Sequence, residues 1–128
     1  MPKGKPGPGA YIPDDGGVCF RLWAPLCTCV SLVITGETET VIPMKETSPG
    51  QAGWFECRTK KARAGTRYLF ELDGGQRRPD PASQYQPEGV HGPSEVVDQS
   101  AFGWEDGGWE NLPLEDYIFY ELHVGTFT

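Results

Sequence analysis

The stretch Val18-Cys-Phe-Arg-Leu-Trp-Ala24 decides the fold, because its apolar residues recur at every second position. Val18, Phe20 and Leu22 fall on one face, and the residues between them fall on the other. Side chains alternate in this way along a β-strand, so the pattern predicts a strand with one face in a core. Pro25 follows directly and ends the strand, since proline has no amide hydrogen for the ladder.

Five further segments of the same type follow along the chain, each bounded by a turn signal. Asp73-Gly74-Gly75 predicts a tight turn, and Ser48-Pro49-Gly50 predicts another. The expected strands cover residues 29–35, 38–44, 53–58, 66–72 and 76–79. Short strands at regular spacing, with no helical stretch between them, predict an all-β protein with an immunoglobulin-like antiparallel β-sandwich.

Composition and charge restrict the partners of this sandwich. The 128 residues are enough for one compact domain, and they carry a net charge of −7. Such a surface repels phosphate groups, so neither nucleic acid nor an anionic membrane is an expected partner. No segment approaches the roughly 18 apolar residues of a membrane span. Residues 1–9 have no apolar centre and read as a flexible lead-in rather than a signal peptide, which predicts a cytoplasmic protein.

The four cysteines do not form a recognisable metal or redox motif. Cys27 and Cys29 are separated by one residue, whereas zinc ligands are usually separated by two to four. Cys19 and Cys57 stand alone in the sequence. We therefore expect no metal and no cofactor, and we expect all four to be small, buried or half-buried side chains in a reducing compartment.

The chain changes character after the sandwich, which we expect over residues 10–98. Residues 79–94 carry four prolines and no periodicity, and residues 99–116 read as a linker.

Residues 117–124 are almost entirely apolar or aromatic, as in a parallel strand that is covered on both faces. A parallel strand needs neighbours and a crossover helix, so residues 117–128 are expected to be the first strand of a second, truncated domain. Without that domain the strand should fold back, pair with another copy or be poorly ordered, rather than lie extended in solvent.

Three motifs resemble enzymes of the α-amylase superfamily. Phe20-Arg-Leu-Trp-Ala-Pro25 resembles the first strand of their N-terminal sandwich, which is grouped as carbohydrate-binding module family 48. Tyr120-Glu-Leu-His-Val-Gly-Thr-Phe-Thr128 resembles the first strand of their (β/α)8 catalytic barrel. Pro79-Asp-Pro-Ala-Ser83 and Gln86-Pro-Glu-Gly-Val-His-Gly-Pro-Ser94 resemble the linker of the maltooligosyltrehalose trehalohydrolase family. Gln99 and Asn111 depart from that linker, where proline and glycine are more common.

The resemblance implies a glycosidase that hydrolyses the α-1,4 bond next to a terminal trehalose unit. Its catalytic carboxylates would lie on later barrel strands, so none is assigned here and the 128-residue chain is expected to be inactive. The implied partners are its own catalytic barrel and an α-glucan or maltooligosyltrehalose. Two alternatives remain: a free glucan-binding module, and the N-terminal domain of a glycogen branching or debranching enzyme.

Five residues are candidates for contacts with sugar or with the barrel. Trp23 and Trp54 could stack on pyranose rings, or they could pack beneath the barrel or the linker. His91 could contact substrate near the cleft, or it could fix its glycine-rich turn through a backbone hydrogen bond. Glu121 and His123 share one face of the last expected strand, which would place them inside the barrel beneath the active site.

Overall fold

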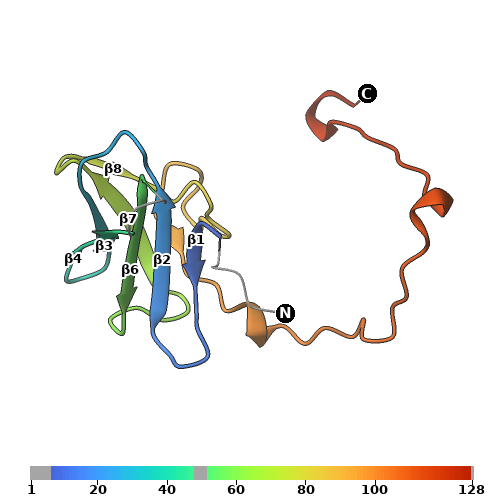
Figure 1. Ribbon diagram of the computed structural model, residues 1–128, viewed down its shortest axis with the longest axis horizontal. Coiled ribbons are helices and arrows are strands. Elements are labelled where there is room, and N and C mark those ends of the chain that lie inside the picture. The colour runs from blue at the N-terminus through green and yellow to red at the C-terminus, as the bar shows by residue number, and fades with distance from the viewer. Residues whose placement is uncertain (1–6, 48–51, 128) are drawn as a thin grey trace.

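The computed structural model describes residues 7–47 and 52–127, which form a two-sheet body followed by an extended C-terminal segment (Figure 1). The first sheet has the strand order β1-β2-β6-β5, and every pairing in it is antiparallel. Its strands are β1 (Gly9–Tyr11), β2 (Val18–Trp23), β6 (Trp54–Thr59) and β5 (Lys45–Glu46).

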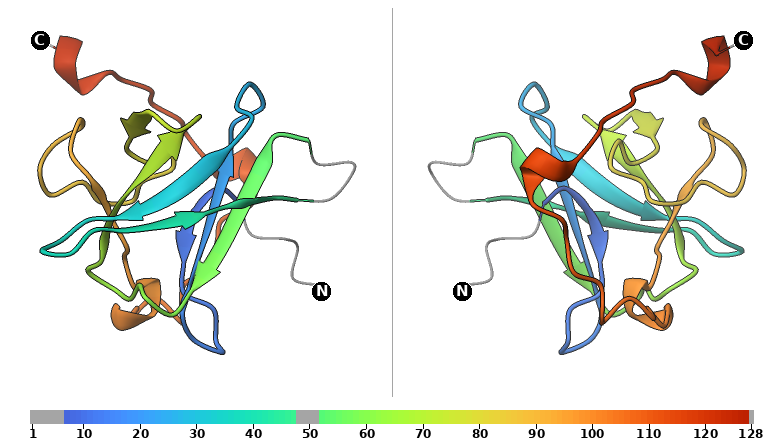
Figure 2. Two further views of the ribbon diagram at one scale, coloured as in Figure 1. Left: turned by 90° about the vertical axis from the view of Figure 1, so that its left-hand side faces the viewer. Right: turned by 90° about the vertical axis from the view of Figure 1, so that its right-hand side faces the viewer.

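The second sheet packs across the first (Figure 2) and is also antiparallel throughout. Its order is β4-β3-β7-β8, and β9 pairs with β7. The strands are β3 (Val30–Ile34), β4 (Thr40–Pro43), β7 (Arg67–Leu72), β8 (Gln76–Arg78) and β9 (Ser94–Glu95). The all-β antiparallel sandwich predicted from the sequence is confirmed, while its immunoglobulin-like class stays a prediction.

The core lies between the inward faces of the two sheets. Phe20 of β2 and Tyr68 of β7 join them through an edge-to-face contact with ring centroids 4.8 Å apart. Both side chains are buried, and burying one large apolar side chain contributes about 1.5–3 kcal/mol. The other large buried members are Val18, Leu22, Val30, Leu32, Ile34, Met44, Phe55, Phe70 and Val96. The face predicted for Val18, Phe20 and Leu22 is therefore the core face.

Six predicted strands agree with the structure to within two residues at each end, whereas β1, β5 and β9 were not predicted. The predicted lead-in lies outside the described residues up to residue 6, and Gly9 already belongs to β1. The predicted turn at residues 48–50 also lies outside the described residues. Cys19 and Cys57 are buried and Cys27 is half-buried, as expected, but Cys29 is exposed because it precedes β3 at a turn.

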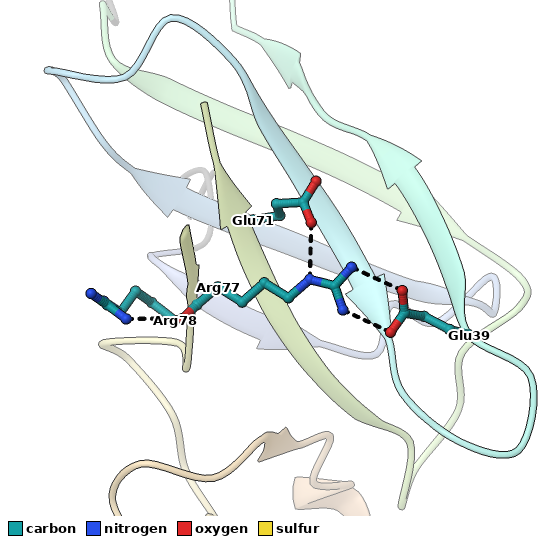
Figure 3. Close-up of polar contacts among 4 residues, drawn as sticks. All are labelled: Glu39, Glu71, Arg77 and Arg78. Carbon is teal, nitrogen blue, oxygen red and sulfur yellow. Dashed lines mark hydrogen bonds and ion pairs between the residues drawn. The ribbon is translucent and has the colours of Figure 1, made fainter. Parts of the chain in front are cut away.

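Arg77 connects the two edges of the second sheet across its outer face (Figure 3). Its guanidinium donates to both carboxylate oxygens of Glu39, at 2.8 and 2.9 Å, and to Glu71 at 2.9 Å. Arg77 lies on β8 and Glu39 directly precedes β4, so the ion pair of the two side chains spans β7 and β3. The hydrogen bonds from Arg77 lower the pKa of Glu39. Bidentate pairing of this kind fixes geometry more than it adds stability at an exposed site.

The turn between β7 and β8 depends on Asp73, which has a φ of 48°. Its Oδ1 accepts the amide hydrogens of Thr28 at 2.8 Å and Cys29 at 3.0 Å. These hydrogen bonds lower the pKa of Asp73, and the bond from Cys29 has the largest effect. The carboxylate thus orders the approach to β3 from a distant part of the chain.

Replacement of Asp73 by Asn is expected to lower stability at neutral pH and to matter little in acid. A depressed pKa in the folded state stabilises the fold above the unfolded value of about 3.9, and this contribution is lost as the pH falls through the folded-state pKa. Asn tolerates the left-handed backbone, so the comparison isolates the charge. Urea midpoints at pH 7 and below about pH 3 measure the effect, with the exposed Asp106→Asn as control. A difference that persists unchanged in acid would contradict this assignment.

The C-terminal segment extends away from the sandwich (Figure 1), and every described residue from 101 onward is exposed. The helical elements of the described chain are three short 3-10 turns, at Gln99–Ala101, Leu114–Asp116 and Val124–Thr126, and none of them could cross a membrane. Residues 117–123 form no strand. The expected fold-back of this stretch onto the sandwich is therefore wrong for this chain, whereas pairing with another copy stays a prediction.

The physical reason is that a strand needs neighbouring strands for its backbone hydrogen bonds, and within the described residues no strand pairs with this segment. Its contacts are local: the rings of Tyr117 and Phe119 stack at 5.8 Å, and Phe102 and Trp104 meet edge to face at 4.8 Å. The assignment of residues 117–128 to a barrel stays a prediction.

Candidate functional site

Trp23 and Trp54 are neighbours on the outer face of the first sheet. They are directly opposite in the register of β2 and β6, so their side chains project from the same face. Trp23 is 58% exposed, whereas Trp54 is half-buried. The two candidate sugar-stacking residues therefore lie together, but only Trp23 presents a largely open indole.

Trp54 covers a buried cation. The guanidinium carbon of Arg21 lies 4.7 Å from the centre of the Trp54 ring, and Arg21 is only 4% exposed. Its Nε lies 3.3 Å from Glu56 but makes no hydrogen bond within the described part of the chain. The sequence places Arg21 on the outer face and so gives no sign that it is buried. Its burial comes from the indole of a neighbouring strand, which strand periodicity does not reveal.

Trp23 forms one wall of an apolar hollow, which we call the Trp23 recess. The volume of the recess is about 250 Å³. Its lining comes from Leu22, Trp23, Ala24, Phe70, Leu72, Pro79 and Pro81, with Arg78 as its charged member. The recess thus combines the end of β2, the end of β7 and the start of the proline-rich segment. A surface hollow with one cation and otherwise apolar walls is suited to a side chain rather than to a polyhydroxylated ring.

A buried polar group holds the proline-rich wall in place. We call it the Asp80 cluster, consisting of Tyr68, Asp80 and Ser94. The Tyr68 hydroxyl donates to Asp80 Oδ2 at 2.6 Å, the Asp80 amide donates to Ser94 Oγ at 3.0 Å, and the Ala82 amide donates to Asp80 Oδ1 at 2.8 Å. Desolvation raises the pKa of Asp80 and of Tyr68. These hydrogen bonds fix the start of the proline-rich segment through residues that the sequence analysis did not single out.

His91 is exposed at the far end of the same segment. Its turn is held by the Gly92 amide, which donates to the Gly89 carbonyl at 3.0 Å, and by Gln86 Nε2, which donates to the Val90 carbonyl at 3.1 Å. Gln86 therefore performs the turn-fixing role that one interpretation gave to His91. The other interpretation, a substrate contact, stays a prediction.

Glu121 and His123 lie in the exposed C-terminal segment, far along the chain from the tryptophan pair. His123 Nδ1 is 3.1 Å from Thr126 Oγ1, a local contact at the last 3-10 turn. The segment that carries both residues extends away from the two sheets (Figure 1). Of the five candidates, the fold brings together only the two tryptophans.

Among the described carboxylates whose pKa is clearly shifted, only Asp80 has a raised pKa. A retaining glycosidase needs two carboxyl groups about 5 Å apart, one of them with a raised pKa at neutral pH. Hydrogen bonds lower the pKa of Asp15, Glu39, Asp73 and Asp98. The Asp80 carboxylate is buried, and it accepts hydrogen bonds from the Tyr68 hydroxyl and the Ala82 amide. The described residues likewise contain no group of three His, Cys, Asp or Glu side chains that could hold a metal ion.

Relatives of this chain are considerably longer than it is. The chain is 42% identical over 118 residues to malto-oligosyltrehalose trehalohydrolase of Saccharolobus solfataricus. The aligned region is 92% of this chain and 20% of that protein. The chain is 44% identical over 117 residues to the enzyme of the same name from Deinococcus radiodurans, covering 91% and 18%. The chain thus spans about a fifth of the length of these relatives.

The fold also has a close counterpart among solved structures. A protein of Salmonella typhimurium described as a candidate α-amylase superposes with a TM-score of 0.75 at 37% identity, over 95% of this chain and 20% of that one. The model of carbohydrate-binding module 48, the isoamylase N-terminal domain, matches residues 8–88. The matched residues include strands β1 to β8 and the two prolines, Pro79 and Pro81, that line the Trp23 recess. The chain therefore belongs to the carbohydrate-binding module 48 family.

Proposed function

We propose that the chain is the N-terminal, non-catalytic sandwich of a malto-oligosyltrehalose trehalohydrolase, in which it packs on the catalytic domain and helps to shape the substrate cleft. The observation that carries this proposal is the identity of up to 44% to enzymes of that name, over nine-tenths of the chain. The similarity extends beyond the sandwich into the C-terminal segment. A module shared by unrelated enzymes would be expected to match over the sandwich alone.

The arrangement of acids supports a non-catalytic role. The exposed carboxylates whose pKa is shifted are acidified by hydrogen bonds, which suits anchoring rather than proton donation at neutral pH. The acid with a raised pKa, Asp80, is 3% exposed and has no access to substrate. In the proposed protein the catalytic carboxylates are supplied by the barrel.

The exposed aromatic segment supports a catalytic partner. Trp104, Trp109, Ile118, Phe119 and Tyr120 are each more than 70% exposed. Soluble proteins rarely leave so many large apolar side chains in water unless another surface covers them. A barrel that takes residues 117–124 as its first strand would bury most of them.

A cytoplasmic location forms part of the same proposal. The four cysteines are free, which suits a reducing compartment. The test is fractionation of the native protein: it should be recovered with soluble cytoplasmic markers.

The test of the activity compares three substrates with the full-length protein encoded by the gene that contains this chain. Maltooligosyltrehalose should yield free trehalose, and amylose should acquire no new α-1,6 branches. Branch formation without trehalose release would instead assign the parent to the branching enzymes. Release of α-1,6-linked chains from glycogen would assign it to the debranching enzymes.

A second candidate function, glucan binding by the sandwich itself, is favoured by the pairing of Trp23 and Trp54 on one face. Stacking on an exposed indole would bring sugar near Glu56, whose side chain is 39% exposed and whose carboxylate accepts hydrogen bonds from hydroxyl groups. Titration of the chain with maltoheptaose, followed by tryptophan fluorescence, tests this. A change that saturates in the millimolar range and disappears in Trp23→Ala would establish binding; the docking role predicts no change.

A further inference from the structure

We infer that the Trp23 recess is the socket through which the sandwich docks on its catalytic domain. It receives one apolar side chain of that domain, next to a carboxylate that pairs with Arg78. The inference rests on the proposed function, because the occupant belongs to the catalytic part of the same protein. It adds which surface of the sandwich makes the contact and what chemistry the contact uses.

The apolar walls of the recess indicate that the occupant inserts an apolar side chain. Leu22, Phe70 and Leu72 extend the core to the surface at this point, and Trp23 is 58% exposed beside them. A volume of about 250 Å³ is sufficient for one large side chain, since a cavity of about 150 Å³ already holds a benzene ring. A sugar would need several hydrogen-bonding partners to replace its water, and the walls offer only Arg78.

Arg78 determines which charged group the occupant carries. Its guanidinium donates only to the Arg77 carbonyl at 3.2 Å and to Gln76 Oε1 at 3.4 Å. Within the described residues no carboxylate pairs with it, whereas its neighbour Arg77 binds both Glu39 and Glu71 (Figure 3). In a chain of net charge −7, a cation without an acidic partner at the rim of an apolar hollow is suited to a carboxylate from outside.

The recess is formed before anything occupies it. Pro79 and Pro81 flank Asp80, and the Asp80 cluster fixes that residue through three hydrogen bonds of 2.6 to 3.0 Å. Proline also restricts the backbone on both sides of the buried carboxylate. A partner therefore meets a rigid surface, and docking loses little conformational entropy on this side of the contact.

The occupant is assigned to the catalytic domain because of the length of the relatives. This chain corresponds to about a fifth of each, so most of the proposed protein lies outside this chain. The C-terminal segment, residues 101–127, is exposed throughout and does not fill the recess itself. A second copy of the chain is the other conceivable occupant, and the experiment below separates the two.

The direct test places a photo-crosslinking residue in the recess of the full-length protein, as Trp23→p-benzoylphenylalanine. Irradiation should give intramolecular crosslinks to peptides that follow Thr128, identified by mass spectrometry. The yield should fall at least fivefold when Arg78→Glu is added. Crosslinks confined to residues 1–128, crosslinks between two copies, or no crosslinks would each overturn the inference.

A stability comparison provides the matched control. Arg78→Glu should lower the melting temperature of the full-length protein by at least about 2 °C, and it should leave that of the 128-residue chain unchanged. Arg63→Glu, an exposed cation distant from the recess, should change neither. Equal losses in both proteins would show that Arg78 acts within the sandwich and would overturn the inference. Trehalose release by the wild type is assayed separately, so its absence refutes the proposed function and not the docking contact.

Discussion

The chain carrying Tyr68→Phe is expected to be less stable than the wild type by about 2 kcal/mol, although only one oxygen atom is lost. The Tyr68 hydroxyl donates to Asp80 at 2.6 Å in a site where both residues are almost fully buried. Removing the donor leaves a buried carboxyl group without that partner, and such a loss costs about 1–3 kcal/mol or more. The aromatic packing against Phe20 and Phe70 is kept, so the change isolates the hydrogen bond.

Urea unfolding at pH 7 measures this loss, and Tyr85→Phe provides the control. Tyr85 is 52% exposed, and its hydroxyl makes no hydrogen bond within the described chain, so its replacement should change the stability by less than about 0.5 kcal/mol. Equal effects of the two replacements would refute a structural role for the Asp80 cluster.

The second large effect is expected for Phe20→Ala, which should cost about 3–5 kcal/mol. Phe20 has no exposed surface, and its ring forms the central contact between the two sheets. Alanine would leave a cavity that the neighbouring strands cannot fill, because both are held in register by their hydrogen bonds. A loss of this size is a large part of the 5–15 kcal/mol by which a typical domain is stable.

The Phe20→Ala prediction is checked by the same urea titration, with Val41→Ala as control. Val41 lies on edge strand β4 and is 47% exposed, so its truncation should have a small effect. A loss below about 1.5 kcal/mol for Phe20→Ala would mean that the sheets are joined elsewhere. In that case Tyr68 and Phe70 would be the next residues to replace.

The fold could be predicted from the sequence wherever apolar and polar residues alternate over four or more positions. The strands at 18–23, 30–34 and 67–72 each carry several apolar residues at every second position, and this pattern also fixes which face is buried. Strands β1, β5 and β9 have only two or three residues. So short a segment has no measurable period, and its pairing depends on a neighbour that is distant in the sequence.

The candidate site could be predicted only in part, for a related reason. Periodicity places Trp23 on the outer face, and the register then brings it beside Trp54. The recess, by contrast, is assembled from residues 22–24, 70–72 and 78–81, three segments that are separated in the sequence. The burial of Arg21 depends in the same way on a ring from the adjacent strand. Such features follow from the tertiary structure and not from the local pattern.

The central claim is that this sandwich is one flank of a much larger catalytic protein, and the intact mass of the native protein tests it most directly. The chain alone has a mass of 14.1 kDa, and it spans 18–20% of the length of its trehalohydrolase relatives. Mass spectrometry of the protein isolated from its natural source should therefore give about five times that mass, with peptides of this chain at the N-terminal end. A native mass of 14.1 kDa would contradict the account and would leave a free-standing member of the family.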